Sequence, residues 1–219
     1  MPRPTILITS HPDDESLFFT PVCLTSGPLL ILCLTTGSHP PSVGAVRSLE
    51  FESACRSLNA DGAVLDSPSL PDTPVPGSWS SEASASAALD FLTSESRGFM
   101  SSHAGPVDVV TFDLGGVSGH PNHVDTCRLA MLWMSSTAPG DAADRRTLRT
   151  LVTLPPWVKY LAPVAAVMAL LDYRNARVCN PLRCARAMRE HRSQMVWYRY
   201  LFVAFGCYSW VNFLREQRG

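Results

Sequence analysis

Short apolar runs alternate with helix-like segments along most of the chain. Thr5–Thr9 and Val107–Phe112 are apolar and rich in β-branched residues, and residues 29–35 form a third such run. Runs with hydrophobic side chains at nearly every position are typical of strands buried on both faces of a parallel sheet. A short strand is predicted over residues 63–65 and a further strand over residues 148–154.

The segments between these runs predict helices. Apolar residues at helical spacing favour helices over residues 15–25, 45–58 and 82–95. Another helix is predicted after the strand Val107–Phe112 and the loop that follows it, ending near residue 135. The C-terminal part is harder to assign, with one or two helices expected over residues 185–205. Alternation of strands and helices predicts an α/β fold with a mainly parallel sheet and helices on both faces. At 219 residues, one domain spanning 1–219 is the simplest organisation.

Three segments are predicted to be loops. Residues 37–44 and 139–146 are short and irregular, whereas residues 67–81 form a longer loop rich in Pro and Ser. Loops of that length inside a domain are more often functional or mobile than simple connectors.

Composition narrows the class of protein. Hydrophobic residues make up 46% and charged residues 17% of the chain, which fits a globular protein, and a net charge of −1 does not favour a nucleic-acid partner. The seven cysteines are odd in number and include no C-x-x-C pair, as expected of reduced, buried thiols in a cytosolic environment. No signal peptide precedes the first predicted strand.

Two charge-free apolar stretches bear on membrane contact. Residues 161–171 and 200–214 are both shorter than the roughly 20 residues that a spanning helix requires. The second stretch is rich in aromatic residues and lies between Arg199 and Arg215. A core helix is the slightly favoured interpretation, and a segment that dips into the membrane interface is the alternative.

The first candidate for chemistry follows the first strand. In His11-Pro12-Asp13-Asp14, the proline favours the first position of a helix, which places His11 at the strand-to-helix corner and both aspartates in the first helical turn. Acidic residues in a first turn also simply complement the helix dipole. This cluster alone therefore does not decide between structure and function.

A second cluster repeats the arrangement after the strand Val107–Phe112. A glycine-rich loop leads to His120-Pro121-Asn122-His123, again with a histidine at the corner and another one turn into a helix. Two histidines and one carboxylate with an open position are typical of catalytic zinc. The remaining carboxylate and histidine would then serve as a general base and an oxyanion-stabilising or proton-donating group. Chemistry alone does not distinguish Asp13 from Asp14.

Other catalytic motifs are absent from the sequence. The glycine-rich segment before His120 lacks the Gly-Lys-Ser/Thr of a phosphate-binding loop, and Ser118 lacks the frame of a nucleophile elbow. The chain also contains no H-E-x-x-H motif.

Together the two clusters resemble the LmbE-like zinc deacetylases. Within these, the segment from Val109 to His123 resembles the N-acetylglucosaminylphosphatidylinositol de-N-acetylases. Weaker similarities support this and span most of the chain: Arg47-x-x-Glu50, Leu70-Pro71-Asp72 and the segment from His191 to Trp197.

The resemblance implies a Rossmann-like fold, one zinc ion and a role for each site residue. It implies that the ligands are His11, Asp14 and His123. It likewise implies that Asp13 is the general base and that His120 stabilises the oxyanion.

Five further residues have open roles. By the resemblance, Arg47 and Asp72 contact the substrate, with a helix-surface salt bridge to Glu50 and a turn-capping aspartate as the alternatives. His191 and Gln194 either brace the site or end a helix, and Glu15 has no assigned role beyond a first-turn or supporting partner.

The function implied is removal of the N-acetyl group from N-acetylglucosaminyl-phosphatidylinositol, the second step of glycosylphosphatidylinositol (GPI) anchor synthesis. Zinc is the expected cofactor, with another divalent metal as an alternative, and the cytoplasmic face of the endoplasmic reticulum membrane is the expected location. Relatives of this type usually carry an N-terminal spanning helix, so we expect either peripheral attachment or an anchor missing from this chain. Two other functions stay open: a soluble deacetylase of another N-acetylglucosamine conjugate, and an inactive sugar-lipid binding module.

Overall fold

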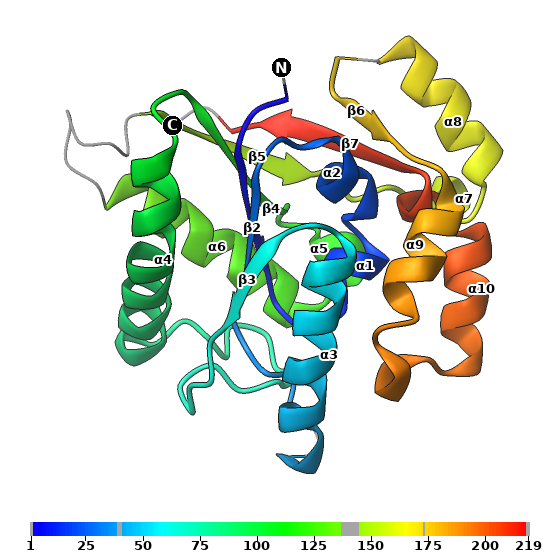
Figure 1. The fold of residues 1–219 in the computed structure, drawn as a ribbon. Helices are drawn as coiled ribbons and strands as arrows, with labels where there is room; N and C mark the ends of the chain where they lie inside the picture. Colours follow the sequence, from blue (N-terminus) through cyan, green and yellow to red (C-terminus); the bar gives the residue numbers. More distant parts are fainter. Residues whose placement is uncertain (1, 39–40, 137–144, 173, 218–219) are drawn as a thin grey trace.

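The strands pair into one sheet in the order β3-β2-β1-β4-β5-β7-β6 (Figure 1). The computed structural model describes residues 2–38, 41–136, 145–172 and 174–217. Strands β1 to β5 are parallel, whereas β7 is antiparallel to both of its neighbours, so the predicted mainly parallel sheet is confirmed. The strands are β1 (Thr5–Thr9), β2 (Leu29–Cys33), β3 (Asp61–Val64), β4 (Val107–Phe112), β5 (Arg146–Leu151), β6 (Ala176–Val178) and β7 (Val211–Glu216).

Helices cover both faces of the sheet, as predicted. In Figure 1, α4 and α6 lie on one side, and α1 to α3 and the C-terminal helices lie on the other. The helices are α1 (Asp14–Leu17), α2 (Thr20–Thr25), α3 (Gly44–Ser57), α4 (Glu82–Ser102), α5 (Gly116–Gly119), α6 (Pro121–Ser135), α7 (Pro156–Lys159), α8 (Ala162–Leu171), α9 (Pro181–Met188) and α10 (Trp197–Phe205). Short 3-10 turns lie at η1 (Pro41–Val43), η3 (Arg192–Gln194) and η4 (Cys207–Ser209).

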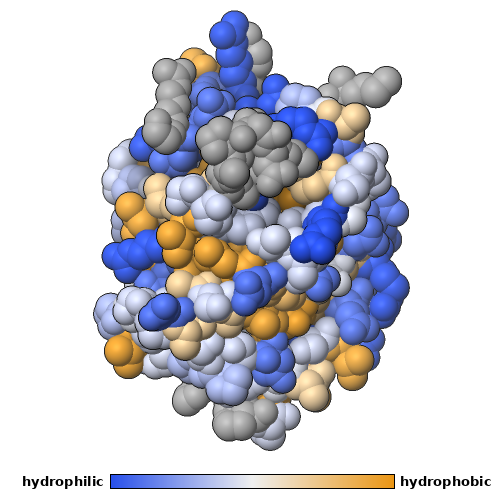
Figure 2. Space-filling view, turned by 90° about the vertical axis from the view of Figure 1, so that its left-hand side faces the viewer, coloured by the Kyte–Doolittle hydropathy of each residue, from blue (hydrophilic) through white to orange (hydrophobic). Residues whose placement is uncertain are grey.

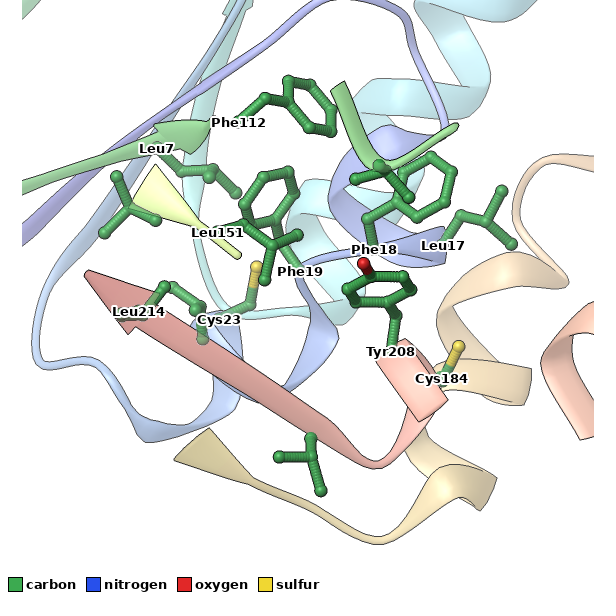
Figure 3. Packing of buried hydrophobic residues seen from close by; sticks show 14 of the residues in the cluster. Leu7, Leu17, Phe18, Phe19, Cys23, Phe112, Leu151, Cys184, Tyr208 and Leu214 are labelled. Carbon is green, nitrogen blue, oxygen red and sulfur yellow. The ribbon is translucent and has the colours of Figure 1, made fainter. Parts of the chain in front are cut away.

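The alternation of side chains along the central strands divides the core into two layers. Ile6 and Ile8 of β1 face α4 and α6, where they pack with residues such as Trp133. Leu7, between them, faces the other layer. Figure 3 shows that layer, in which Phe19 and other aromatic residues fill the space between β1, β4 and the C-terminal strand.

The predicted helix over residues 15–25 is divided into α1 and α2. The break at Phe18 is held by Asn212 of β7, whose side chain is completely buried. Its amide donates to the carbonyl oxygen of Phe18 at 2.7 Å and accepts from the amide of Val22 at 3.2 Å. One distant side chain therefore supplies hydrogen-bond partners to a backbone carbonyl at the end of α1 and to a backbone amide in the first turn of α2. No local sequence pattern predicts this contact.

The interpretation of residues 200–214 as a core helix is wrong. Helix α10 ends at Phe205, the chain makes the turn η4, and residues 211–216 form strand β7. The backbone approaches closely at this point, since a side chain on Gly206 would place its Cβ 2.5 Å from the carbonyl oxygen of Phe202. The aromatic residues accordingly separate into exposed ones, such as Tyr200, and buried ones, such as Tyr208.

Smaller differences concern element ends. Helix α4 continues past residue 95 to Ser102, and β3 and β5 begin two residues earlier than predicted. The predicted 185–205 helical region consists of α9, η3 and α10. Most of the predicted 139–146 loop lies outside the described residues. Among the helices that the structure describes, none combines the length and apolar character needed to cross a membrane.

The contact of Asn212 predicts a large effect on stability. Replacing Asn212 by Leu leaves a buried carbonyl and a buried amide without partners, so we expect the free energy of unfolding to fall by about 2–4 kcal/mol. Urea unfolding followed by circular dichroism measures this change. Asn175→Ala, at an exposed asparagine, is the control and should stay within about 0.5 kcal/mol of the wild type. If the free energy of unfolding of Asn212→Leu fell as little as that of the control, Asn212 would not hold the break between α1 and α2.

Candidate metal centre and active site

The candidate site lies at the point in the sheet where the order of the strands reverses, between β1 and β4. Strand β1 pairs with β2 on one side and with β4 on the other, both in parallel. Ligand sites of open α/β sheets lie outside the carboxyl ends of strands at such a switch point. The two His-Pro clusters follow β1 and β4, so the pairing brings them together from over a hundred residues apart. Their contact is direct, since Asn122 Nδ2 lies 3.1 Å from His11 Nε2.

Three buried side chains form a candidate metal centre. Asp14 lies between two imidazoles, with Oδ1 3.3 Å from His123 Nε2 and Oδ2 3.5 Å from His11 Nδ1. One ligand atom of each residue lies within 4.8 Å of the others. Nitrogen and oxygen donors of this kind suit a divalent metal such as zinc. The structure therefore brings together His11, Asp14 and His123, as the resemblance implied.

The surroundings orient these three side chains. Asp14 Oδ2 accepts hydrogen bonds from the backbone amides of Ser10 and His11, at 3.1 and 2.8 Å. His123 Nδ1 donates to the carbonyl oxygen of Gly116 at 3.1 Å, which directs Nε2 toward Asp14. Its ring stacks on Phe112 with 4.0 Å between centroids. Such supporting contacts are the usual way in which proteins orient metal ligands.

Charge interactions in the cluster determine which of its groups carry a proton. The imidazoles, His123 first, hold the pKa of Asp14 well below its usual range despite its burial. Burial lowers the pKa of His11, but the nearby carboxylates of Asp14 and Asp72 outweigh burial and raise it to about 9. The metal-free cluster thus holds an extra proton on His11, which a metal ion would displace.

Asp13 is separate from this cluster although it is adjacent in sequence. Its backbone is strained, with φ at 143°, in a region that favours glycine. Its buried carboxylate pairs with Arg47 of α3, Oδ1 to Nη2 at 3.1 Å, and with Arg199 of α10. Asp13 and Asp14 therefore have different partners, and backbone strain of this type is concentrated at functional sites.

Glu15 has a supporting role that the sequence left open. Its carboxylate lies 2.6 Å from Nε2 of His191, and both side chains are completely buried. It also accepts hydrogen bonds from the Ser16 hydroxyl at 2.6 Å and from the Asp13 amide at 3.1 Å. Burial lowers the pKa of His191, but the charge of Glu15 outweighs burial and raises it above its usual range. Glu15 and His191 therefore brace the strained turn at Asp13.

His120 is half-buried beside the three candidate ligands. Its ring centroid lies 5.0 Å from that of His11 and 4.8 Å from that of His123. Burial, together with these two histidines, lowers its pKa to about 4, so the imidazole is neutral at physiological pH. Nδ1 is buried without a hydrogen-bond partner in the described part of the chain.

A second strained turn presents this histidine. Val117 has φ at 63°, which is unusual for a β-branched residue. Its amide donates to Thr153 Oγ1 at 2.8 Å, and its carbonyl accepts from Lys159 Nζ at 3.0 Å. These contacts hold the loop between β4 and α6 in a fixed conformation.

The loop over residues 67–81 reaches the site. Asp72 Oδ1 lies 3.2 Å from His11 Nε2, and Oδ2 lies 3.8 Å from Arg47 Nη1. Leu70 and Trp79 anchor the loop because both are buried in the core. A second group that could hold a metal consists of His11, Asp72 and His120, although only His11 of these is fully buried.

Arg47 makes contacts other than the surface salt bridge considered from the sequence. Its guanidinium is buried and points toward Asp13 and Asp72. Glu50 instead accepts hydrogen bonds from the amide and hydroxyl of Ser193, at 2.7 and 2.6 Å. Arg199 was missed as a site residue, because only the packing of α10 against the site brings it to Asp13.

Solved structures identify the fold. The chain is similar to N,N'-diacetylchitobiose deacetylase from Pyrococcus horikoshii, with a TM-score of 0.60 and 18% identity over 99% of this chain and 84% of that one. It is also similar to a deacetylase of teicoplanin biosynthesis, with a TM-score of 0.56 and 13% identity over 98% of both chains. A 4-carboxy-2-hydroxymuconate hydratase from Pseudomonas putida has the same fold. Its TM-score is 0.62 and its identity 10%, over 99% of this chain and 97% of that one. Because the fold hosts more than one chemistry, it alone does not decide the function.

Sequence comparison identifies one family among the proteins that share this fold. Residues 6–134 match the GlcNAc-PI de-N-acetylase family. The chain is 32% identical to the N-acetylglucosaminyl-phosphatidylinositol de-N-acetylase of Bos taurus, over 96% of this chain and 82% of that protein. It is 26% identical to a probable enzyme of the same name from Schizosaccharomyces pombe, over 96% of this chain and 86% of that protein. The chain belongs to the GlcNAc-PI de-N-acetylase family, which confirms the resemblance.

The candidate metal centre predicts loss of metal on removal of a ligand. Changes to supporting residues alone weaken metal binding by about 10- to 100-fold. We therefore expect His123→Ala to purify with little or no metal, as measured by elemental analysis. His103→Ala changes a histidine outside the candidate site and should keep the wild-type metal content. Full occupancy in His123→Ala would refute the ligand role.

The pair of Glu15 and His191 predicts a pH-dependent stability. Because the pKa of His191 is raised on folding, the contribution of the pair is complete below about pH 6.5 and is lost as pH rises through the folded-state pKa. Loss of one partner leaves a buried charge, so we expect His191→Gln to be less stable by about 3 kcal/mol at low pH. The difference from the wild type should shrink toward alkaline pH in urea unfolding. A difference that grows with pH would contradict the assignment.

Proposed function

We propose that residues 1–219 form a single metal-dependent deacetylase domain. It hydrolyses the N-acetyl group of N-acetylglucosaminyl-phosphatidylinositol to a free amine and acetate, as in the second step of GPI anchor synthesis. The single observation that supports this most is the buried cluster of His11, Asp14 and His123 in a chain of this family. The names of the relatives favour the glycolipid as the substrate.

Zinc is the proposed cofactor, held by His11, Asp14 and His123. The fit rests on the two imidazoles, the carboxylate between them and the supporting hydrogen bonds to Asp14 and His123. When bound, zinc supplies Lewis acidity toward the acetyl carbonyl and lowers the pKa of water. The same donors would also accept another divalent metal.

Asp13 and His120 are the proposed catalytic residues. Asp13 accepts a proton from the attacking water and later transfers it to the leaving amine, which requires its carboxylate to stay out of the metal centre. The ion pairs with Arg47 and Arg199 hold it there. His120 is neutral and only half-buried, and a neutral imidazole can donate a hydrogen bond to the developing oxyanion.

Arg47 and Asp72 are the proposed substrate contacts. They lie beside the candidate metal centre and beside each other, and Asp72 is partly accessible. A guanidinium and a carboxylate of this kind recognise the hydroxyl and phosphate groups of a glycosylated inositol phosphate. The lipid substrate places the enzyme at a membrane, for which we propose the cytoplasmic face of the endoplasmic reticulum.

Two alternatives to the glycolipid deacetylase are weaker. The P. horikoshii neighbour is a deacetylase of diacetylchitobiose, so this fold also serves a soluble sugar substrate, but its identity to this chain is 18% against 32% for the bovine relative. An inactive binding module has no need of the strained, doubly paired Asp13 beside an intact ligand set.

The role of Asp13 predicts a selective loss of turnover. Asp13→Asn removes the proton acceptor without removing a ligand, so we expect kcat to fall by about 10²- to 10⁴-fold while metal content stays at the wild-type level. Acetate release from the glycolipid and elemental analysis measure the two quantities. Asp90→Asn, on the exposed face of α4, is the matched control. Wild-type turnover in Asp13→Asn would contradict the assignment of the base.

A further inference from the structure

A group of exposed aromatic and apolar side chains lies beside the active site. Helix α10 and the end of α7 form a groove lined by Tyr160, Trp197, Tyr198, Leu201, Phe202 and Phe205. All of these except Phe202 are more than half exposed, and Trp197 is 74% exposed. We call these six residues the aromatic face. Soluble proteins rarely expose large apolar residues in such a contiguous group, which marks an interaction surface.

Helix α8, which packs against α7, exposes further apolar side chains. Its sequence contains no charged or hydrogen-bonding side chain, yet Leu170 and Leu171 are 78% and 84% exposed. A helix that is apolar all round is normally covered by protein or lipid. In Figure 1, α7, α8 and α10 lie on the same side of the molecule. Figure 2 shows the opposite side, around α4, where hydrophobic residues form separate patches among hydrophilic ones.

The charge of this region suits an anionic surface. Residues 157–205 contain eight Lys or Arg residues and two acidic residues, whereas the whole chain contains 18 and 19. Arg183, Arg186 and Arg189 are exposed on α9, which packs against α10. None of these three forms an ion pair with the described residues. Basic side chains beside exposed Trp and Tyr are typical of segments that bind anionic lipid headgroups.

The aromatic face is directly connected to the active site. Arg199 lies in the same helix as Trp197 and Leu201, but its side chain points inward and pairs with Asp13. A substrate with its sugar at Asp13 would therefore have its lipid end beside α10.

We propose that the aromatic face, together with α8, docks on an anionic phospholipid bilayer and presents the active site to a substrate held in that bilayer. The argument rests on the proposed glycolipid substrate, as well as on the exposure and charge of this surface. Peripheral docking of this kind buries Trp, Tyr and Leu side chains at the headgroup boundary, and nearby arginines contact lipid phosphates. It differs from the interfacial segment considered as the alternative for residues 200–214, whose last part is buried in the sheet.

The test uses sedimentation with vesicles of phosphatidylcholine, with and without phosphatidylinositol. Trp197→Ser/Leu201→Ser changes two exposed side chains and should reduce vesicle binding by about tenfold or more, since both apolar side chains would be buried at the headgroup boundary. Leu132→Ser, at an exposed leucine of α6, is the control and should bind as the wild type does. Replacing Arg183, Arg186 and Arg189 by Ser should remove the preference for phosphatidylinositol.

Two activity assays separate docking from catalysis. The double variant should lose activity on glycolipid in vesicles by the same factor as its binding, and should keep wild-type activity on the water-soluble N-acetylglucosaminyl-inositol-phosphate headgroup. Wild-type vesicle binding by the double variant, or no vesicle binding by the wild type, would overturn the proposal.

Other outcomes identify which proposal fails. A concentration-dependent dimer that the double variant abolishes, without vesicle binding, would mean that a second copy covers the face and would overturn docking. Vesicle binding that depends on Trp197 and Leu201, with no deacetylation of either substrate, would support docking and refute the proposed function.

Discussion

The parallel pairing of β1 with β4 is the constraint on which the candidate active site depends. It places the carboxyl ends of two buried strands side by side. His11-Pro12 leads from β1 to Asp13, the N-cap of α1, and the loop after β4 leads to His120-Pro121 at the start of α6. The pairing brings His11 and Asp14 to His123 although they are far apart in sequence. Strained conformations at Asp13 and Val117, each of which costs about 1–3 kcal/mol, persist because the strands before them and the helices after them are fixed by the core.

Three consecutive buried carboxylates are separated by their partners. Asp14 faces two imidazoles and two backbone amides, Asp13 faces two guanidinium groups, and Glu15 faces His191. Burying a carboxylate without such partners is costly, so the fold must bring cations from elsewhere in the chain. They come from α3, α10 and the segment before η3. The division of labour proposed for the three acids follows from this separation: one binds metal, one moves a proton and one holds the turn.

The features of the fold that depend on local sequence patterns could be predicted from the sequence. The central strands and the order of elements up to β5 follow from apolar runs. The preference of proline for helix starts predicted the start of α6 at Pro121. The same prediction was wrong for Pro12 and Asp13, because α1 begins only at Asp14 and Asp13 is its strained, non-helical N-cap. The break between α1 and α2 could not be predicted, because Asn212 holds it from the far end of the chain. Strand β7 was missed because its aromatic and apolar residues suit a helix equally well. Arg199 and the partnership of Glu15 with His191 are contacts between distant residues, and no spacing in a single sequence reports them.

Acetate release from N-acetylglucosaminyl-phosphatidylinositol, compared with release from soluble N-acetylglucosamine conjugates, tests the central claim most directly. Both substrates should be assayed with and without a chelator, followed by addition of zinc. The account predicts preferential release from the glycolipid, which the chelator abolishes and zinc restores. Release that the chelator leaves unchanged, or faster release from the soluble conjugates, would contradict it.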